Sequence, residues 1–176
     1  MEADKKISFV IPCYRSQDTI GDVVGDIHQV MGEHLSWRYE VVLVNDGSPD
    51  DTSGAIAALA RADSRVVAVD LMRNFGQASA IMAAYHYVSG DIIVNLDDDG
   101  QTDPKQVFRL IDALTPDLDV VYARYDSKKH NAFRNFGSKV NNIMADHLIG
   151  KPRELIFTSY FCARRQVVDE MIKYDK

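Results

Sequence analysis

Three consecutive aspartates, Asp97, Asp98 and Asp99, stand directly after the apolar run 92–96 and before a turn at 100–104. Neighbouring carboxylates repel one another, so a fold tolerates them best where a cation or solvent spreads the charge. Asp97 and Asp99 are two residues apart and would point the same way in extended backbone. Carboxylate oxygens are the ligands that hard divalent cations prefer. The pattern therefore predicts that Asp97 and Asp99 share one divalent ion after a buried strand.

A basic block between residues 122 and 139 is a second feature that could take part in binding or catalysis. It holds five lysines and arginines against one aspartate, a net charge of +4 in a chain whose formal charge is −6. Arg134 and Ser138 are one helical turn apart and would share a helix face, and the guanidinium fork suits phosphate oxygens. A solvated helix face would explain the same charges. Charge alone therefore leaves both interpretations open.

Length and composition narrow the class of protein. The chain has 176 residues, of which 46% are hydrophobic and 26% charged, as expected for one folded domain. No apolar run approaches the roughly 20 residues that cross a bilayer, and the first strand comes too early for a secretory signal. Cys13 and Cys162 are too far apart in sequence for a disulfide framework and are expected as reduced, buried thiols.

Hydrophobic spacing predicts strands and helices in alternation. Ser16 is expected to cap the first helix, and Ser48-Pro49-Asp50-Asp51 is typical of the start of the second. Gly90 is expected to end the third helix. The expected strands are 7–11, 39–44, 65–71, 91–96 and 119–123, with a short extended piece at 157–163. The expected helices are 20–31, one from about 48, one through 81–88, 104–114, 133–147 and one from 165.

Strands buried on both faces and separated by helices imply an α/β fold, a mainly parallel, doubly wound sheet with helices on both faces. In such sheets ligands bind beyond the carboxyl ends of the strands. Four polar clusters fall at those ends: 12–14, 45–47, 73–76 and 97–99. The chain has neither GxGxxG after the first strand nor GxxxxGK[ST], so dinucleotide and P-loop sites are excluded. Phosphates bound at this edge would therefore need a metal ion.

Motifs along nearly the whole chain resemble a known family. The segments 10–14, 44–52, 73–80 and 96–104 are similar to family 2 glycosyltransferases, which have the Rossmann-like GT-A fold. Within that family, the segments 119–124, 134–139 and 159–165 most resemble the polyprenyl-phosphate branch, the dolichol-phosphate mannose synthase-like enzymes.

The resemblance implies a role for each matching position on the donor side. Pro12 and Tyr14 would pack the base and ribose, and Asp46 would accept a hydrogen bond from the base imino group. Arg73 and Asn74 would contact the nucleotide. Asp97 and Asp99 would hold the diphosphate through Mg²⁺ or Mn²⁺, with Gln101 near the phosphates. The expected catalytic residues are Asp97, Asp99 and Gln101.

On the acceptor side, the resemblance places a phosphate site at Arg124, Arg134 and Ser138. A hydroxyl acceptor needs a general base, yet residues 155–163 contain no carboxylate. A phosphate acceptor is already ionised at neutral pH and needs only positioning. We therefore expect inverting transfer of a sugar from a nucleotide-diphosphate sugar to a lipid-linked phosphate.

Two positions depart from the family pattern. Arg15 stands where the family often has asparagine. Asp98 replaces a small neutral residue and would either face away from the metal or raise the metal affinity.

Other functions stay open at this point. A family 2 enzyme acting on a glycan hydroxyl is the nearest alternative, and a non-catalytic nucleotide-sugar-binding module belongs to another class. A sugar-phosphate nucleotidyltransferase is disfavoured because its glycine-rich, arginine-bearing N-terminal loop is absent.

The chain is expected to form a single domain over 1–176, with a nucleotide-sugar half at 1–100 and an acceptor half at 101–176. The sequence stops just after a predicted helix, so we expect a C-terminally truncated chain. The resemblance implies a cytoplasmic protein at the inner face of the cell membrane, attached peripherally or through segments missing here. No nucleic acid partner is expected.

Overall fold

The computed structural model describes residues 5–100, 102–123 and 158–174, and within them six strands form one sheet in the order β3-β2-β1-β4-β6-β5. Five strands run in the same direction: β1 (Lys6–Cys13), β2 (Arg38–Asn45), β3 (Val66–Asp70), β4 (Ile92–Asn95) and β5 (Val120–Tyr122). The sixth, β6 (Phe161–Arg164), lies between β4 and β5 and is antiparallel to both. The predicted α/β class and mainly parallel sheet are confirmed.

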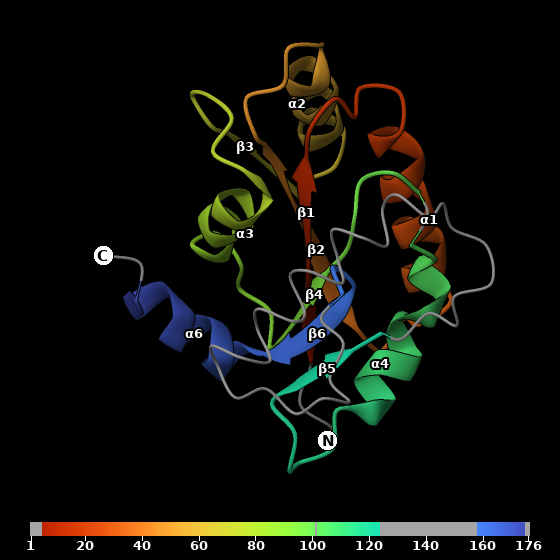
Figure 1. Cartoon of the computed structure of the whole chain (residues 1–176). Helices are drawn as coiled ribbons and strands as arrows, with labels where there is room; N and C mark the ends of the chain where they lie inside the picture. The colour runs from red at the N-terminus through yellow and green to blue at the C-terminus, as the bar shows by residue number, and fades with distance from the viewer. Residues whose placement is uncertain (1–4, 101, 124–157, 175–176) are drawn as a thin grey trace, which may run out of the picture.

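Helices cover both faces of the sheet (Figure 1). The helices α1 (Ile20–Gly32), α2 (Thr52–Ala62) and α4 (Val107–Ala113) pack with one face, and α4 follows a short 3₁₀ turn, η1 (Pro104–Gln106). The helices α3 (Gln77–Tyr85) and α6 (Arg165–Tyr174) pack with the other face. Side chains of β1 alternate between the two cores, because successive strand residues point to opposite faces: Phe9 and Ile11 enter the first core, and Val10 enters the second.

The first helix starts at Ile20 as predicted, but its predicted cap at Ser16 and the predicted start of the second helix are wrong. Helix α1 begins at Ile20 with Thr19 as its N-cap, and Ser16 contributes its carbonyl oxygen, which accepts from the amides of Thr19 and Ile20, rather than its side chain. Helix α2 begins at Thr52, after the predicted Ser48–Asp51 start, because the hydroxyl of Ser48 accepts a hydrogen bond from the distant Arg15 amide. In both places a contact with another loop replaces the local cap.

The predicted end of the third helix at Gly90 is also wrong. Helix α3 ends at Tyr85, and the chain then turns toward β4. A Cβ at Gly90 would lie 2.7 Å from the backbone nitrogen of Ser8, so the absence of a side chain permits close packing on β1. The predicted helix 133–147 lies outside the described residues. Among the described helices, none has the length and apolarity that crossing a membrane requires.

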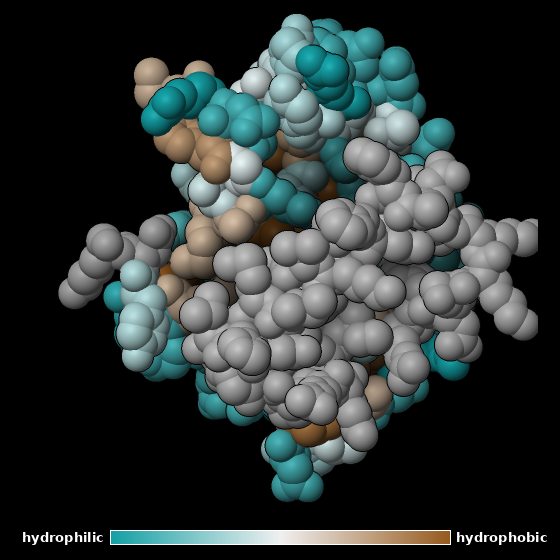
Figure 2. Space-filling view, viewed as in Figure 1, coloured by the Kyte–Doolittle hydropathy of each residue, from teal (hydrophilic) through white to brown (hydrophobic). Residues whose placement is uncertain are grey.

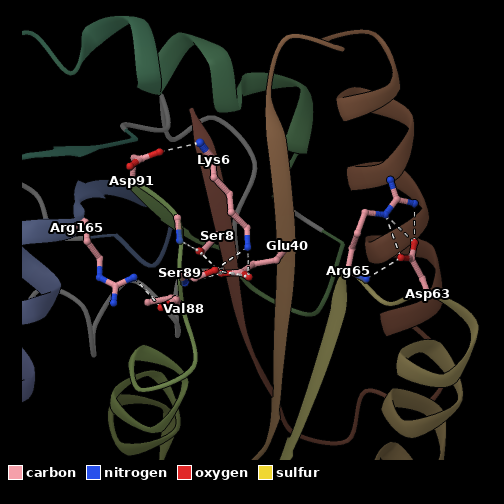
Figure 3. Close-up of polar contacts among 10 residues, drawn as sticks. Lys6, Ser8, Glu40, Asp63, Arg65, Val88, Ser89, Asp91 and Arg165 are labelled. Carbon is pink, nitrogen blue, oxygen red and sulfur yellow. Dashed lines mark hydrogen bonds and ion pairs between the residues drawn. The ribbon is translucent and has the colours of Figure 1, made fainter. Parts of the chain in front are cut away.

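A buried polar cluster joins β1, β2 and the segment before β4 (Figure 3). The carboxylate of Glu40 accepts hydrogen bonds from Lys6 Nζ at 2.5 Å, from Ser8 Oγ at 2.6 Å and from the Ser89 amide at 2.6 Å. The hydroxyl of Ser8 in turn accepts from the Gly90 amide at 2.8 Å. The cluster lies at the amino ends of the strands, opposite to the edge where the polar motifs gather.

Candidate functional site

A pocket of about 470 Å³ lies at the carboxyl ends of the central strands. Six of the predicted site residues line it: Pro12, Tyr14, Asp46, Asn74, Asp97 and Asp99. Five further residues complete the lining: Cys13, Gly76, Gln77, Asp98 and Ser159. The parallel strands therefore bring the sequence motifs to one place, as the sheet topology predicted.

Arg73 is the described site residue that does not line the pocket. Its guanidinium lies over the ring of Phe75, 4.6 Å from the ring centroid, and its side chain is exposed. In Figure 2 the loop between β3 and α3, at the upper left, presents both brown and teal residues, in keeping with exposed Met72, Arg73 and Phe75. The remaining predicted site residues, Gln101, Arg124, Arg134 and Ser138, lie outside the described residues.

The loop after β1 forms one wall of the pocket and is held by side chains. The Tyr14 amide donates to Asp98 Oδ2 at 2.9 Å, the Arg15 amide to Ser48 Oγ at 3.1 Å and the Ser16 amide to Thr52 Oγ1 at 2.8 Å. The Ser16 hydroxyl also donates to Asp98 Oδ2, in a short contact. Arg15 has a φ of 60°, a left-handed conformation that asparagine tolerates better than arginine.

Asp46 connects the end of β2 to the loop before α3. Its side chain is buried, and its two oxygens accept from the amides of Phe75 at 2.7 Å and Gly76 at 2.8 Å. The neighbouring Gly47 has a φ of 60°, and a Cβ there would lie 2.3 Å from the carbonyl carbon of Arg73. Asp46 thus fixes the position of the 73–76 loop. Each carboxylate oxygen has a second lone pair, so the predicted contact with a base remains compatible with these bonds.

Asp97, the first carboxylate of the acidic turn, is held through both of its oxygens. Its Oδ1 accepts from Gln77 Nε2 at 3.1 Å, and its Oδ2 accepts a short hydrogen bond from Ser159 Oγ. Burial raises the pKa of Asp97, the Ser159 bond opposes that rise, and the negative charge of Asp99 adds to it. A bound cation would compensate the charge that this environment disfavours.

Sequence reasoning assigned no role to Ser159 or Gln77. Gln77 is the first residue of α3, and Ser159 lies just before β6, 62 residues from its partner Asp97. Serine and glutamine next to strand or helix ends are common, so their types give no signal. Only the insertion of β6 beside β4 brings Ser159 to the acidic turn.

The donor set fits a divalent ion shared with a substrate. Among the described residues, no group of three or more His, Cys, Asp or Glu side chains is arranged to hold a metal alone. Mg²⁺ in proteins usually binds one or two carboxylates together with substrate phosphates and water. The half-buried Asp97 and the exposed Asp99 would supply hard oxygen ligands of this kind on the wall of an open pocket.

A second pocket, of about 490 Å³, lies at the amino ends of the strands and includes Lys6, His28, Trp37 and Arg65. Its cationic groups already have partners, because Lys6 pairs with Glu40 and Arg65 pairs with Asp63 at 2.6 Å. It also lies at the sheet edge where α/β folds rarely bind ligands. The acidic pocket is therefore the better candidate, although the two volumes are similar.

A model of the family described as "Glycosyl transferase family 2" matches residues 8–172. The chain belongs to this family. The undecaprenyl-phosphate 4-deoxy-4-formamido-L-arabinose transferases of Sodalis glossinidius (strain morsitans) and Klebsiella pneumoniae (strain 342) are each 36% identical to it. The alignments cover 95% and 96% of this chain and 51% of each relative. The chain therefore spans about half the length of the curated relatives that it matches.

Solved structures of related fold support the architecture of this family 2 chain. Glucosyl-3-phosphoglycerate synthase from Mycobacterium tuberculosis, in complex with Mn²⁺, UDP and glucosyl-3-phosphoglycerate, superposes with a TM-score of 0.72 at 20% identity, covering 94% of this chain and 59% of that one. Mannosyl-3-phosphoglycerate synthase from Rubrobacter xylanophilus gives 0.70 at 16% identity, covering 93% and 54%. At these identities the likeness shows the fold. The family assignment made from the sequence motifs is confirmed by the family model and the curated relatives.

Proposed function

We propose that the chain is the glycosyltransferase domain of a metal-dependent, inverting enzyme that moves a sugar from a nucleotide-diphosphate sugar to a polyprenyl phosphate. The observation that carries the proposal is the pocket itself, where Asp97 and Asp99 stand beside Tyr14 and Asp46. The names of the relatives support a lipid-linked phosphate as acceptor. The proposed domain has its nucleotide-sugar half at 1–100 and its acceptor half at 101–176.

On the donor side, Pro12 and Tyr14 would pack the base and ribose, and Asn74 would contact the nucleotide from the opposite loop. Asp97 and Asp99 would hold Mg²⁺ or Mn²⁺, which neutralises charge on the departing diphosphate. Ser159 and Gln77 hold both oxygens of Asp97, so this ligand would need little reorganisation when the substrate binds. In this proposal Gln101 lies near the phosphates.

On the acceptor side, the proposal needs no proton removal. Residues 155–163 contain no carboxylate, and a phosphate monoester is ionised at neutral pH without help. Arg124, Arg134 and Ser138 are the proposed ligands of that phosphate. Their task is to place one phosphate oxygen in line with the bond from the anomeric carbon to the leaving group. Because the proposed acceptor is a lipid, the enzyme would work at a membrane surface, and the resemblance to the polyprenyl-phosphate branch favours the inner face of the cell membrane.

The proposal is tested by incubating the chain with UDP-, GDP- and dTDP-sugars and a short-chain polyprenyl phosphate in detergent, with Mn²⁺, with Mg²⁺ or with EDTA. We expect one donor to yield a polyprenyl-phosphate sugar, and EDTA to abolish the product. The matching polyprenol is the control acceptor and should yield none. Transfer to the polyprenol or to a glycan hydroxyl would favour the alternative acceptor, and donor binding without any transfer would favour a binding module.

The acceptor assignment makes a prediction of its own. Replacing Arg134 by alanine should raise the KM for the polyprenyl phosphate about 10-fold, because a charge-assisted contact to phosphate is lost. The affinity for the nucleotide should stay within about 2-fold of the unaltered chain, since the donor site is formed by other residues. Steady-state kinetics and calorimetry measure the two quantities. An equal loss of both would contradict the assignment of Arg134 to the acceptor phosphate.

A further inference from the structure

We propose that Asp98 is a positioning residue, which fixes the β1–α1 loop as a wall of the nucleotide site, and that it is not a ligand of the metal ion. The inference rests on the proposed function, because it gives this loop its role in nucleotide binding. The inference gives Asp98 a different role from Asp97 and Asp99, although all three are aspartates in the same turn.

The contacts of Asp98 point to the loop. A single oxygen, Oδ2, accepts both the Tyr14 amide, at 2.9 Å, and the Ser16 hydroxyl. These partners lie 82 to 84 residues away along the chain, at the end of β1. Asp97, by contrast, is held from α3 and from the segment before β6. Successive aspartates of the turn are therefore anchored to different parts of the molecule.

The loop depends on such side-chain anchors. The amides of Tyr14, Arg15 and Ser16 all donate to side chains, two of which come from the β2–α2 segment and one from the acidic turn. Arg15, in the middle, has a left-handed φ of 60°, which costs on the order of 1 kcal/mol for such a residue. A strained backbone persists only when its surroundings fix it. Four hydrogen bonds to side chains hold this backbone, donated by the three amides and by the Ser16 hydroxyl, and Asp98 accepts two of them.

The consequence is a link between the two halves of the donor site. Tyr14 is 45% exposed and lines the pocket, so it is available to pack against a base. Its backbone is fixed by the residue between the two proposed metal ligands. The diphosphate near the acidic turn and the base near Tyr14 would then bind to two segments that the Asp98 hydrogen bonds hold together. Loss of the Asp98 contacts should weaken nucleotide binding even when the metal still binds.

Four variants separate the possible roles. Asp98→Ala removes both hydrogen bonds, whereas Asp98→Asn retains an oxygen that can accept both and loses only the charge. Ser16→Ala removes one bond and leaves the acidic turn intact. Asp99→Asn is the matched control, because it makes the same chemical change one residue away. Each variant is measured by amide hydrogen exchange at residues 14–16 without ligand, by Mn²⁺ binding without nucleotide, and by UDP binding at saturating Mn²⁺.

For Asp98→Ala we expect the Tyr14 amide to exchange about 10-fold faster. UDP should bind about 10-fold more weakly, as when a hydrogen-bonded anchor is lost. The affinity for Mn²⁺ alone should stay within about 3-fold of that of the unaltered chain, because the variant loses a nearby negative charge but no metal ligand. Asp98→Asn should stay within about 3-fold in all three measurements. Ser16→Ala should weaken UDP binding by a smaller factor, and Asp99→Asn should lose Mn²⁺ binding at least about 10-fold with unchanged exchange at Tyr14.

Two outcomes would overturn the inference. If Asp98→Asn lost Mn²⁺ binding as Asp99→Asn does, Asp98 would be a metal ligand. If Asp98→Ala left both the exchange at Tyr14 and the affinity for UDP unchanged, and only lowered the melting temperature, its role would be general stability. Failure of the unaltered chain to bind UDP, GDP or dTDP with Mn²⁺ would instead contradict the proposed function. The exchange measurement would still report whether Asp98 fixes the loop.

Discussion

Arg15 shows how a single backbone conformation can decide which side chain suits a position. Its φ of 60° is left-handed, and its guanidinium lies 5.6 Å from the ring centroid of Tyr14. Asparagine, the residue that the family resemblance leads us to expect at this point, accepts that conformation more readily. The arginine thus has an unfavourable backbone conformation, but its side chain contacts Tyr14, the proposed base-binding residue.

The backbone part of this effect can be measured by comparing two substitutions. Arg15→Asn and Arg15→Ala both lose the contact with Tyr14, but only asparagine tolerates the left-handed region. We expect the asparagine variant to have a free energy of unfolding about 0.5–1 kcal/mol higher than the alanine variant. Urea denaturation followed by circular dichroism measures the difference. Equal stabilities would mean that the loop relaxes to another conformation when arginine is removed.

Ser159 makes a prediction about metal affinity. Partners that hold a ligating carboxylate commonly contribute 10- to 100-fold to metal binding, so Ser159→Ala should weaken Mn²⁺ binding about 10-fold. Ser159→Thr retains the hydroxyl and should bind nearly as the unaltered chain does. Ser53→Ala is the control, because it removes a similar bond of 3.0 Å to Asp70 and should leave Mn²⁺ affinity unchanged. Electron paramagnetic resonance of free Mn²⁺ gives the affinities. Equal effects of Ser159→Ala and Ser53→Ala would exclude this role for Ser159.

At the level of elements, the loops after β2 and β3 meet through a glycine. A Cβ at Gly47 would lie within 2.6 Å of three backbone atoms of Arg73 and Asn74, and the φ of 60° is itself unfavourable for alanine. Gly100 has a similar φ of 68° but nothing within 4 Å of the added Cβ. Alanine substitutions at Gly47 and Gly100 therefore distinguish the energetic cost of a positive φ, which both share, from the cost of a steric clash, which only Gly47 has.

We expect Gly47→Ala to lower the free energy of unfolding by about 3 kcal/mol, the sum of strain and overpacking. Gly100→Ala should cost only about 1 kcal/mol, because strain alone applies there. Thermal or urea denaturation of the metal-free chain measures both. A loss at Gly47 no larger than that at Gly100 would show that the 73–74 loop moves aside freely.

The same loops show what could be predicted from the sequence. The alternation of strands and helices could be predicted because hydrophobic periodicity is a local signal. The connection rules of parallel sheets then place Tyr14, Asp46, Asn74 and Asp97 at the same edge. The cap at Ser16 and the helix start at Ser48 were mispredicted, because the side chains of both serines interact with distant loops. The partners of Asp97 and Asp98 were equally hidden, since they lie 20 to 84 residues away along the chain. Long-range side-chain contacts leave no periodic trace in the sequence.

The whole molecule places its two polar clusters at opposite ends of the sheet. At the carboxyl ends, partial burial raises the pKa of Asp97, so its environment disfavours the charged form. At the amino ends, Glu40 is held as a charged group by Lys6, Ser8 and Ser89 (Figure 3). One end therefore carries an open pocket lined by carboxylates, and the other joins the first two strands to the segment before β4.

The Glu40 cluster predicts how stability changes with pH. Burial raises the pKa of Glu40, but the bonds from Lys6, Ser8 and Ser89 together outweigh it, and the pKa lies below its ordinary value of 4.5. A lowered pKa in the folded state contributes stability above pH 4.5, and that stability is lost as the pH falls through the folded value. Glu40→Gln should therefore lower the free energy of unfolding by about 2 kcal/mol at about pH 7 and by clearly less at about pH 3.

Glu170→Gln is the matched control for this pH dependence, because Glu170 pairs with Lys173 at 2.6 Å on the exposed surface of α6. Exposed pairs contribute little, so this variant should differ from the unaltered chain by less than about 0.5 kcal/mol at both pH values. Urea denaturation at the two pH values gives all the differences. A Glu40→Gln effect that stayed constant with pH would mean that the cluster acts through hydrogen-bond geometry alone. The decline on acidification is expected only if the carboxylate charge, held between β1 and β2 by Lys6, stabilises the sheet.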